Sequence, residues 1–161
     1  MASSTSRVKD VMTSSPACCV PGTPLQDVAV MLIENDCGAI PVVENKDTGR
    51  PVGVVTDRDI AVRAVAAGKN ALDLRAVDCM TTPCVAVSED MTLEECVAMM
   101  EGNKLRRIVV VNDSGAVCGI VAQADLALKA DEEKVAEVVK MVSQPAKPRA
   151  EQPSATSPPA A

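Results

Sequence analysis

The chain has 161 residues, of which 47% are hydrophobic, a length and composition typical of one compact domain or of two small units sharing a core. It contains no aromatic residue and no histidine, which excludes imidazole-based catalysis and the stacking of bases on aromatic rings. The formal net charge of −6 is the wrong sign for binding a nucleic-acid backbone or an anionic membrane, so we expect neither partner.

The first predicted elements are a short strand and a helix. The strand covers Ala17 to Val20. Thr23-Pro24-Leu25-Gln26 then has the features of a helix start: an N-cap threonine, a proline at the first helical position and a capping-box glutamine. We expect this helix to extend to about Asn35. Its run Val28 to Ile33 is apolar around the whole circumference, which predicts that the helix buries more than one face.

Two strands and a second helix complete the first half of the chain. The strands, Ala39 to Val43 and Pro51 to Thr56, are rich in β-branched residues and flank a polar turn. Asp57 to Ala67 returns to a helical composition, and Gly68 supplies the signal that ends the helix.

The second half repeats this order of elements. Val11-Met12-Thr13 recurs as Cys79-Met80-Thr81, 68 residues later. The run Gly53 to Ile60 recurs as Gly119 to Leu126, 66 residues later. Thr92 to Glu95 is a second capping box. The chain is therefore predicted to contain an internal structural duplication.

These signals predict the organisation of the whole chain. The expected parts are a flexible N-terminus (1–7), repeat 1 (8–68), a linker (69–76), repeat 2 (77–130, its last helix at about 123–130), a C-terminal helix (131–142) and a disordered tail (143–161). The linker is too short to separate independent domains, so the repeats should pack on each other. The predicted fold class is α/β (α+β), with two pseudo-symmetric β-α-β-β-α repeats.

The cysteines and the apolar pattern limit the cellular setting. Seven cysteines without a Cys-x-x-C pair predict neither a complete disulfide framework nor a metal site, and most should be reduced core residues. A redox role for Cys18, Cys19 or Cys37 is the alternative. No apolar stretch approaches the roughly 20 residues of a membrane span, and the N-terminus lacks the apolar core of a signal peptide, so we expect a cytoplasmic protein.

Three motifs in a fixed order carry a family resemblance. Val11-Met12-Thr13, Gly38-Ala39-Ile40-Pro41-Val42-Val43 and Gly53-Val54-Val55-Thr56-Asp57-Arg58-Asp59 follow one another in the first half, and the same plan returns in the second. From about Val8 to Leu128 the chain resembles the tandem cystathionine-beta-synthase-type (CBS) pair, or Bateman module, in its small stand-alone form. The resemblance implies a regulatory unit that binds an adenine nucleotide between its repeats and has no catalytic centre.

The resemblance also implies roles for individual residues. Asp59 is expected to accept the ribose hydroxyls, Thr56 to offer a hydroxyl, and Arg58 to contact phosphate. The adenine is expected in an aliphatic slot, read by backbone groups of two segments. These segments comprise Ala17, Cys18, Cys19, Ala39, Ile40 and Pro41. Simple core packing of Ile40 and Pro41 is the alternative, as is a helix-dipole role for Asp59.

The second repeat departs from this pattern at its hydroxyl position. That position is Ala122, although Asp125 is present, so we expect a weaker second site and one strong nucleotide site per chain. Arg106 and Arg107 precede the strand Ile108 to Val111 and are implied to reach phosphates bound by the first repeat. A solvated basic loop is the alternative.

The predicted function is regulatory binding of AMP, ADP or ATP, as a ligand rather than a cofactor, by a protein that is not an enzyme. A ligand-free dimeric scaffold and a thiol redox protein are the alternatives. The apolar run Val28 to Ile33, with Val97 to Met100 at the matching place, predicts a homodimer held by apolar burial. A sensor of this kind also implies a protein target, which the sequence does not identify.

Overall fold

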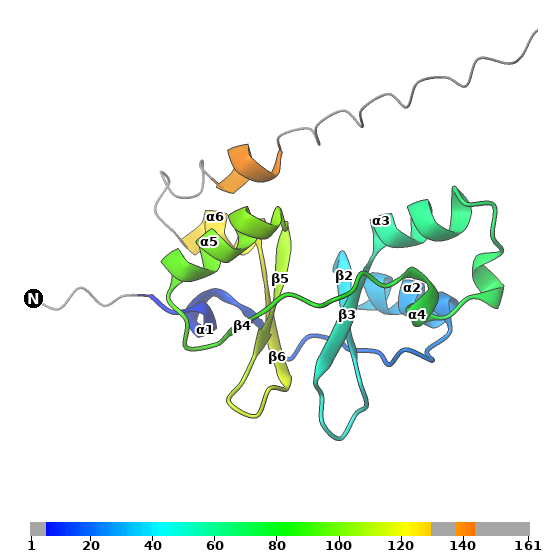
Figure 1. Ribbon diagram of the computed structural model, residues 1–161, viewed down its shortest axis with the longest axis horizontal. Helices are drawn as coiled ribbons and strands as arrows, with labels where there is room; N and C mark the ends of the chain where they lie inside the picture. Colours follow the sequence, from blue (N-terminus) through cyan, green and yellow to red (C-terminus); the bar gives the residue numbers. More distant parts are fainter. Residues whose placement is uncertain (1–5, 130–137, 144–161) are drawn as a thin grey trace, which may run out of the picture.

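The structure, a computed structural model, describes residues 6–129 and 138–143. Two lobes, one per repeat, lie side by side (Figure 1). The first lobe contains α2 (Leu25–Glu34), β2 (Ala39–Val43), β3 (Pro51–Thr56) and α3 (Asp57–Ile60). The second contains β4 (Ala86–Ser88), α5 (Leu93–Asn103), β5 (Arg107–Val111), β6 (Val117–Ala122) and α6 (Gln123–Lys129). The predicted α+β fold class is confirmed.

Each lobe is built around an antiparallel hairpin. β2 pairs with β3 from Ala39 opposite Thr56, and β5 pairs with β6 in the same way. All five residues of β2 are buried, as expected for a strand that is apolar on both faces. Both strands of the first hairpin have the bounds that their β-branched sequences predict.

The strand predicted at Ala17 to Val20 is reduced to a single bridge. Cys19 exchanges two backbone hydrogen bonds with β2, of 3.0 and 2.8 Å, in a parallel arrangement. Pro16 and Pro21 flank this segment, and a proline cannot donate a ladder hydrogen bond. The equivalent segment of the second lobe forms the three-residue strand β4, parallel to β5.

The predicted N-cap role of Thr23 is wrong. α2 begins at Leu25 with Pro24 as its N-cap residue, and Thr23 Oγ1 instead accepts a hydrogen bond from Val20 N over 3.1 Å. The first helical amide, Leu25 N, donates to Leu74 O over 2.9 Å. The linker therefore satisfies a helix start that a local side chain was expected to cap.

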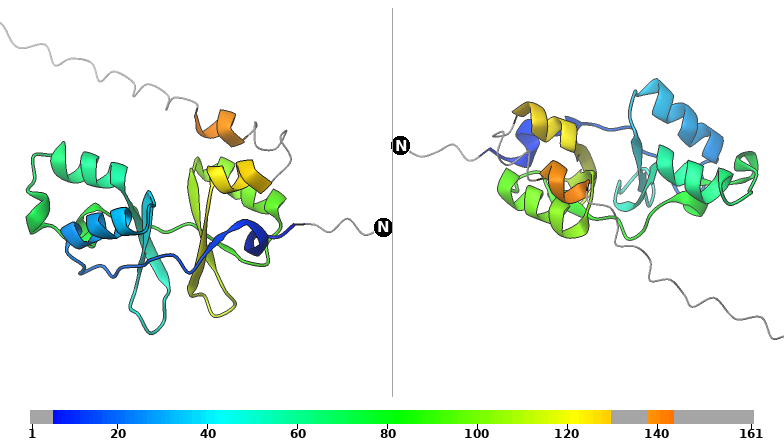
Figure 2. Two further views of the ribbon diagram at one scale, coloured as in Figure 1. Left: turned by 180° about the vertical axis from the view of Figure 1, so that it is seen from behind. Right: turned by 90° about the horizontal axis from the view of Figure 1, so that it is seen from above.

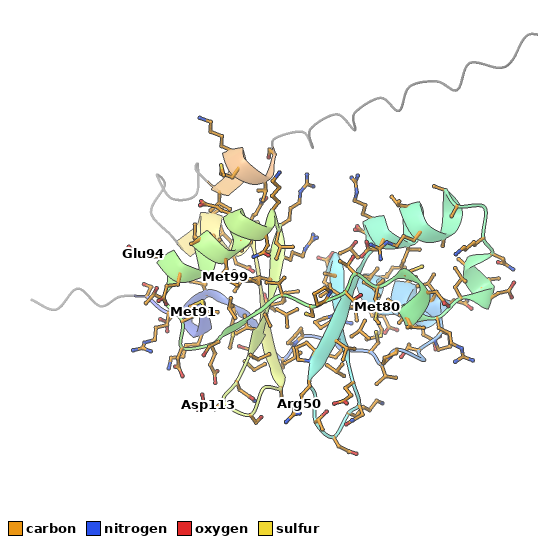
Figure 3. All side chains as sticks on the ribbon, in the orientation of Figure 1. Arg50, Met80, Met91, Glu94, Met99 and Asp113 are labelled. Carbon is orange, nitrogen blue, oxygen red and sulfur yellow. The ribbon has the colours of Figure 1, made fainter. Side chains whose placement is uncertain are left out.

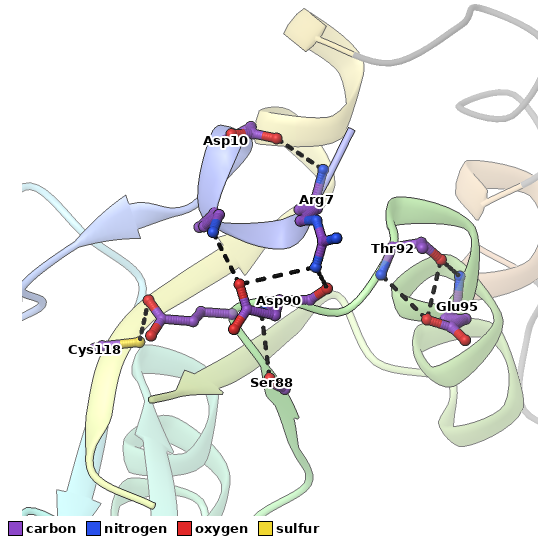
Figure 4. Close-up of polar contacts among 9 residues, drawn as sticks. Arg7, Asp10, Ser88, Asp90, Thr92, Glu95 and Cys118 are labelled. Carbon is purple, nitrogen blue, oxygen red and sulfur yellow. Dashed lines mark hydrogen bonds and ion pairs between the residues drawn. The ribbon is translucent and has the colours of Figure 1, made fainter. Parts of the chain in front are cut away.

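Two other predicted helix signals, the capping box at Thr92 and the stop at Gly68, agree with the structure. Thr92 Oγ1 accepts from Glu95 N (3.2 Å) and Glu95 Oε2 accepts from Thr92 N (3.1 Å), which confirms the capping box of α5 (Figure 4). α3 continues as one π-helical turn, η1 (Ala61–Val65). Gly68 ends it in the left-handed conformation, with φ of 73°, where glycine carries no steric penalty.

Three predicted parts fall mainly outside the described residues. These are the flexible N-terminus at 1–7, the disordered tail at 143–161 and the first part of the C-terminal helix at 131–142. Residues 138–142 are helical.

The N-terminal segment packs on the second lobe rather than on its own repeat. α1 (Val8–Val11) contributes two valines to the core of the second lobe, and β1 (Thr13–Ser14) pairs with β6. The first amide of α1 donates to Met91 O over 2.9 Å. Arg7 Nη1 donates to the backbone oxygen of Asp90 over 3.0 Å (Figure 4). The chain then crosses to the first lobe (Figure 2).

A matching segment between the repeats packs on the first lobe. α4 (Ala76–Cys79) buries its first and last residues in the core of that lobe. Val54 N donates to Thr81 O (3.2 Å), and Thr81 N donates to Val54 O (2.8 Å). The stretch predicted as a linker, 69–76, thus contains the short helix η2 (Ala71–Asp73) and the start of α4. Each lobe therefore packs against the short helix that opens the other repeat: α1 packs on the second lobe, and α4 packs on the first.

The exchanged segments meet the hairpins through matching methionine and glycine pairs. A Cβ built on Gly53 would lie 2.9 Å from Met80 Sδ and 3.0 Å from Thr81 O, and one on Gly119 would lie 2.9 Å from Met12 Cγ. Met80 lies over the first hairpin (Figure 3). The glycine of each Gly-apolar-apolar motif therefore provides the space for the methionine of a Met-Thr motif.

We expect Gly53→Ala to lower the free energy of unfolding by about 1–3 kcal/mol, because the new methyl group would displace Met80 and press on the backbone of Thr81. Urea unfolding followed by circular dichroism measures this change. Gly102→Ala is the control, since Gly102 lies in α5 with no atom within 4 Å of a built Cβ; alanine there should stabilise by up to about 1 kcal/mol. Equal stability of Gly53→Ala and the unsubstituted protein would contradict the packing argument.

Candidate functional site

A cavity of about 760 Å³ lies between the two lobes, within the roughly 300–1,000 Å³ typical of small-molecule sites. Four parts of the chain form its walls: the end of β3 with the start of α3, the segment after α4, the loop between α5 and β5, and residues 142–143. The lining residues are Val54, Thr56, Asp57, Arg58, Asp59, Thr81, Pro83, Cys84, Val85, Lys104, Leu105, Arg106, Arg107, Val109, Val142 and Ser143.

A reciprocal pair of hydrogen bonds positions Thr56 and Asp59 at the start of α3. Asp59 N donates to Thr56 Oγ1 and Thr56 N donates to Asp59 Oδ2, both over 3.0 Å. Thr81 Oγ1 lies 3.4 Å from Asp59 Oδ1 and can donate to it. This capping box fixes a half-buried carboxylate and hydroxyl at the cavity wall, beside the N-terminal amides of a helix.

Four cationic side chains also line the cavity. Arg58 comes from α3, and Lys104, Arg106 and Arg107 come from the other lobe. The ion pairs found among the described residues, Arg7–Asp90 and Lys9–Asp90, involve none of them. The cleft therefore offers cationic groups from both lobes, and guanidinium groups are well suited to bind phosphate oxygens.

Asp57 is the second carboxylate at the wall. It is exposed, and its Oδ1 accepts a hydrogen bond from Arg58 N over 2.8 Å. Asp57 therefore faces solvent at the start of α3, where its charge is favourable near the N-terminal amides.

Arg107 extends toward the first lobe. A Cβ built on Gly38 would lie 2.8 Å from Arg107 Cζ, so the guanidinium group occupies the space that a side chain at position 38 would take. Gly38 directly precedes β2, and Arg107 begins β5. The arginine thus spans the junction of the lobes.

An apolar group completes the cavity. Its members are Val54, Pro83, Cys84, Val85, Leu105 and Val109. Burial raises the pKa of the Cys84 thiol to about 11, so this side chain is uncharged and adds to the apolar surface. The cavity therefore combines an aliphatic slot with a carboxylate and several cations.

The structure brings together only part of the predicted site. Thr56, Arg58, Asp59, Arg106 and Arg107 line one cavity. The six residues predicted around the adenine do not: Ala17, Cys18, Cys19, Ala39, Ile40 and Pro41.

These six residues lie mainly in the first lobe's core. Ile40 is fully buried, which agrees with the alternative prediction that it is a core residue. Ala17 packs against the same core. Cys18 and Cys19 line a separate hollow of about 270 Å³ near Gly49.

Sequence reasoning missed the segment Thr81 to Val85, which takes the place expected for Ala17 to Cys19. The signal was available in the internal repeat, because Val85 follows Ala17 by the same 68 residues that separate the Met-Thr motifs. The β3–α3 junction of the first repeat faces the segment that leads into β4 of the second repeat. Val85 of the second repeat, rather than Ala17 of the first, therefore lines the cavity.

The second repeat contains half of the same capping arrangement. Ala122 N donates to Asp125 Oδ2 over 2.8 Å, but alanine has no hydroxyl to accept the return bond. Neither residue lines the described cavity.

No group of three or more Cys, Asp or Glu side chains among the described residues is arranged to hold a metal ion. None of the helices in the described part of the chain is long and apolar enough to span a membrane.

Comparison with known proteins identifies the family. The CBS domain family model matches residues 8–65 and 74–132, so the chain belongs to the CBS domain family, as a tandem pair. CBS domain-containing protein YhcV of Bacillus subtilis is 37% identical over 123 residues, which cover 76% of this chain and 84% of that protein. Uncharacterized protein MK0525 of Methanopyrus kandleri is 34% identical over 118 residues, 73% of this chain and 57% of that protein.

The fold also matches solved structures of CBS proteins. CBS domain protein PAE2072 from Pyrobaculum aerophilum, complexed with AMP, superposes with a TM-score of 0.70 at 26% identity, covering 84% of this chain and 99% of that one. The resemblance stated from the three sequence motifs is confirmed.

We expect iodoacetamide at pH 8 to modify Cys37 before the buried thiols. Cys37 is exposed, whereas burial raises the pKa of Cys19, Cys84 and Cys96 to about 11, which leaves roughly one thiolate in a thousand at pH 8. Peptide mass spectrometry gives the order of labelling, with the unfolded protein as the control in which all thiols react. Fast labelling of Cys19 in the folded protein would contradict this expectation and favour a redox role.

Proposed function

We propose that this CBS pair is a non-catalytic regulatory module that binds an adenine nucleotide, AMP, ADP or ATP, in the cavity between its lobes. The observation that carries the proposal is the capping box of Thr56 and Asp59 in one cavity with Arg58, Arg106 and Arg107. Carboxylate, cations and an aliphatic slot are the groups that a nucleotide's ribose, phosphates and base require. The AMP complex of the similar Pyrobaculum protein supports this ligand class.

Each part of the nucleotide has a matching surface. Asp59 Oδ1, whose partner is the long 3.4 Å contact from Thr81, is the oxygen available to accept ribose hydroxyls. The cations attract the phosphates from both lobes, so a bound nucleotide bridges the two repeats. Val54, Val85 and Val109 provide apolar surface for the base. No histidine is present in the chain to serve as a general base.

We propose one strong site per chain. Thr56 supplies a hydroxyl that also accepts the Asp59 N hydrogen bond of the capping box, whereas Ala122 has no hydroxyl and contributes only its backbone amide to Asp125. Loss of one hydrogen bond to a polar ligand costs about 1–3 kcal/mol, or roughly 5- to 150-fold in affinity.

The exposed apolar surface of the first lobe supports dimer formation. Within the apolar run of α2, Val28 and Leu32 enter the core, but Val30 is 42% and Ile33 79% exposed. Val62, Val65, Leu72 and Val77 are also exposed large hydrophobics of this lobe. In α5, by contrast, Met100 is fully buried and Met99 packs against the core. We propose a homodimer in which the first lobe contributes most of the apolar contact.

A constitutive scaffold is the second candidate function. The same exposed apolar residues favour it, since a protein–protein interface does not require an occupied cavity. Binding measurements separate the two, because a scaffold would dimerise without affinity for nucleotides.

We expect Asp59→Ala to weaken AMP and ATP binding by at least about tenfold, because the carboxylate that accepts the ribose hydroxyls is removed. Calorimetry gives the affinity and a stoichiometry near one per chain. A chain without aromatic residues also reveals retained nucleotide directly by its absorbance near 260 nm.

Asp113→Ala is the matched control for this experiment. Asp113 lies in the turn between β5 and β6, at the end of the lobe remote from the helices (Figure 3), and its removal should leave the affinity unchanged. Nucleotide binding that is equally tight in Asp59→Ala and the unsubstituted protein would refute the proposed site, and absence of binding would favour the scaffold.

We expect Ile33→Asp to convert the proposed homodimer to a monomer, because a charge would replace the most exposed of the apolar side chains named above. Sedimentation equilibrium measures the mass of the assembly. Ile33→Leu, which keeps the apolar surface, should remain dimeric. A dimer that persists in Ile33→Asp would place the interface elsewhere.

A further inference from the structure

Residues 138–143 form a separate wall of the cavity. This segment lies beyond residues 8–65 and 74–132, which match the CBS domain family, yet Val142 and Ser143 line the cavity together with Thr56 and Asp59. It lies above the helices of the second lobe (Figures 1 and 2). Ser143 N donates to Val139 O over 3.0 Å, so the helical geometry extends to the cavity wall.

One residue anchors this segment. Val138 is 1% exposed, whereas Val139 and Met141 are 43% and 42% exposed. A segment with a single fully buried side chain has few apolar contacts, and segments of this kind open at low free-energy cost. Contacts between this segment and a bound ligand would therefore add substantially to the small free energy that holds the segment in place.

We propose that residues 138–143 complete the nucleotide site, with Val142 and Ser143 in contact with the ligand, so that nucleotide binding and docking of this segment stabilise each other. The inference rests on the proposed nucleotide-binding function and adds the part of the chain that responds to occupancy. Ser143 offers a hydroxyl that can donate to phosphate or ribose oxygens. Val142 lines the same cavity as Lys104 and Arg106 of the second lobe.

Thermodynamic linkage makes the proposal quantitative. If docking of the segment increases nucleotide affinity by a given factor, the nucleotide increases the docking equilibrium by the same factor. Couplings between sites are commonly 5- to 150-fold, by order of magnitude. Two independent measurements, affinity and protection of the segment, must therefore change together.

The test uses three aspartate substitutions in the full-length protein. Val142→Asp places a carboxylate in the cavity wall, where it would repel the phosphates of an anionic ligand. Val138→Asp removes the anchor by placing a charge in an apolar environment. Val139→Asp is the matched control, since Val139 is an exposed valine of the same helical turn and does not line the cavity. Calorimetry with AMP and with ATP gives the affinities, and hydrogen exchange monitors residues 138–143 with and without each nucleotide.

We expect Val142→Asp and Val138→Asp to weaken nucleotide binding by about 5- to 20-fold, and Val139→Asp by less than about twofold. Nucleotide should slow exchange in residues 138–143 of the unsubstituted protein by at least about fivefold, and this protection should be lost in Val138→Asp. If Val138→Asp does not fold, Val142→Asp still provides the test, because its side chain is only half-buried.

The outcomes separate this inference from the proposed function. Tight nucleotide binding that is unchanged in Val142→Asp and Val138→Asp overturns the inference and leaves the proposed function intact. An equal loss of affinity in Val139→Asp also overturns it, because the effect would then come from added charge alone. Failure of the unsubstituted protein to bind AMP or ATP removes both proposals.

Discussion

The backbone pairing between β3 and Thr81 is the contact on which both the core and the cleft depend. Two hydrogen bonds with Val54, of 3.2 and 2.8 Å, fix the segment that follows α4. The same short stretch carries Met80 over Gly53 and directs Pro83 to Val85 along the cavity wall. Cys79 and Met80, which pack in the core of the first lobe, directly precede the residues that form the wall of the site. A change in one group is therefore transmitted to the other through a few bonds of backbone.

Features governed by local sequence were predicted correctly, and those satisfied by distant residues were not. The hairpin strands have strong β-branched patterns, and the capping box of Thr92 needs only residues of its own turn. Thr23 has the same local signature, but Leu74 O satisfies the first amide of α2 instead. No local pattern reports a backbone partner so far along the chain, and the exchange of α1 and α4 between lobes escaped prediction for the same reason.

The candidate site shows the same division. Thr56 and Asp59 could be placed together from their motif, because a strand that runs into a capped helix orients its own side chains. The wall formed by Thr81 and Pro83 to Val85 could not be assigned in this way. Its position depends on how the two repeats pack together, which no local motif indicates. The internal duplication contains the missing information, but only when the pseudo-symmetry is applied across the cleft rather than within one repeat.

The close approach of Arg107 to Gly38 couples two positions that belong to different repeats. Any side chain at position 38 would meet the Arg107 guanidinium group in its present position, so a mutation there is tolerated only if the arginine is lost or moves. Because the guanidinium group is the flexible end of its side chain, it can shift to make room, so the residue at position 38 determines where this cation lies at the cavity wall.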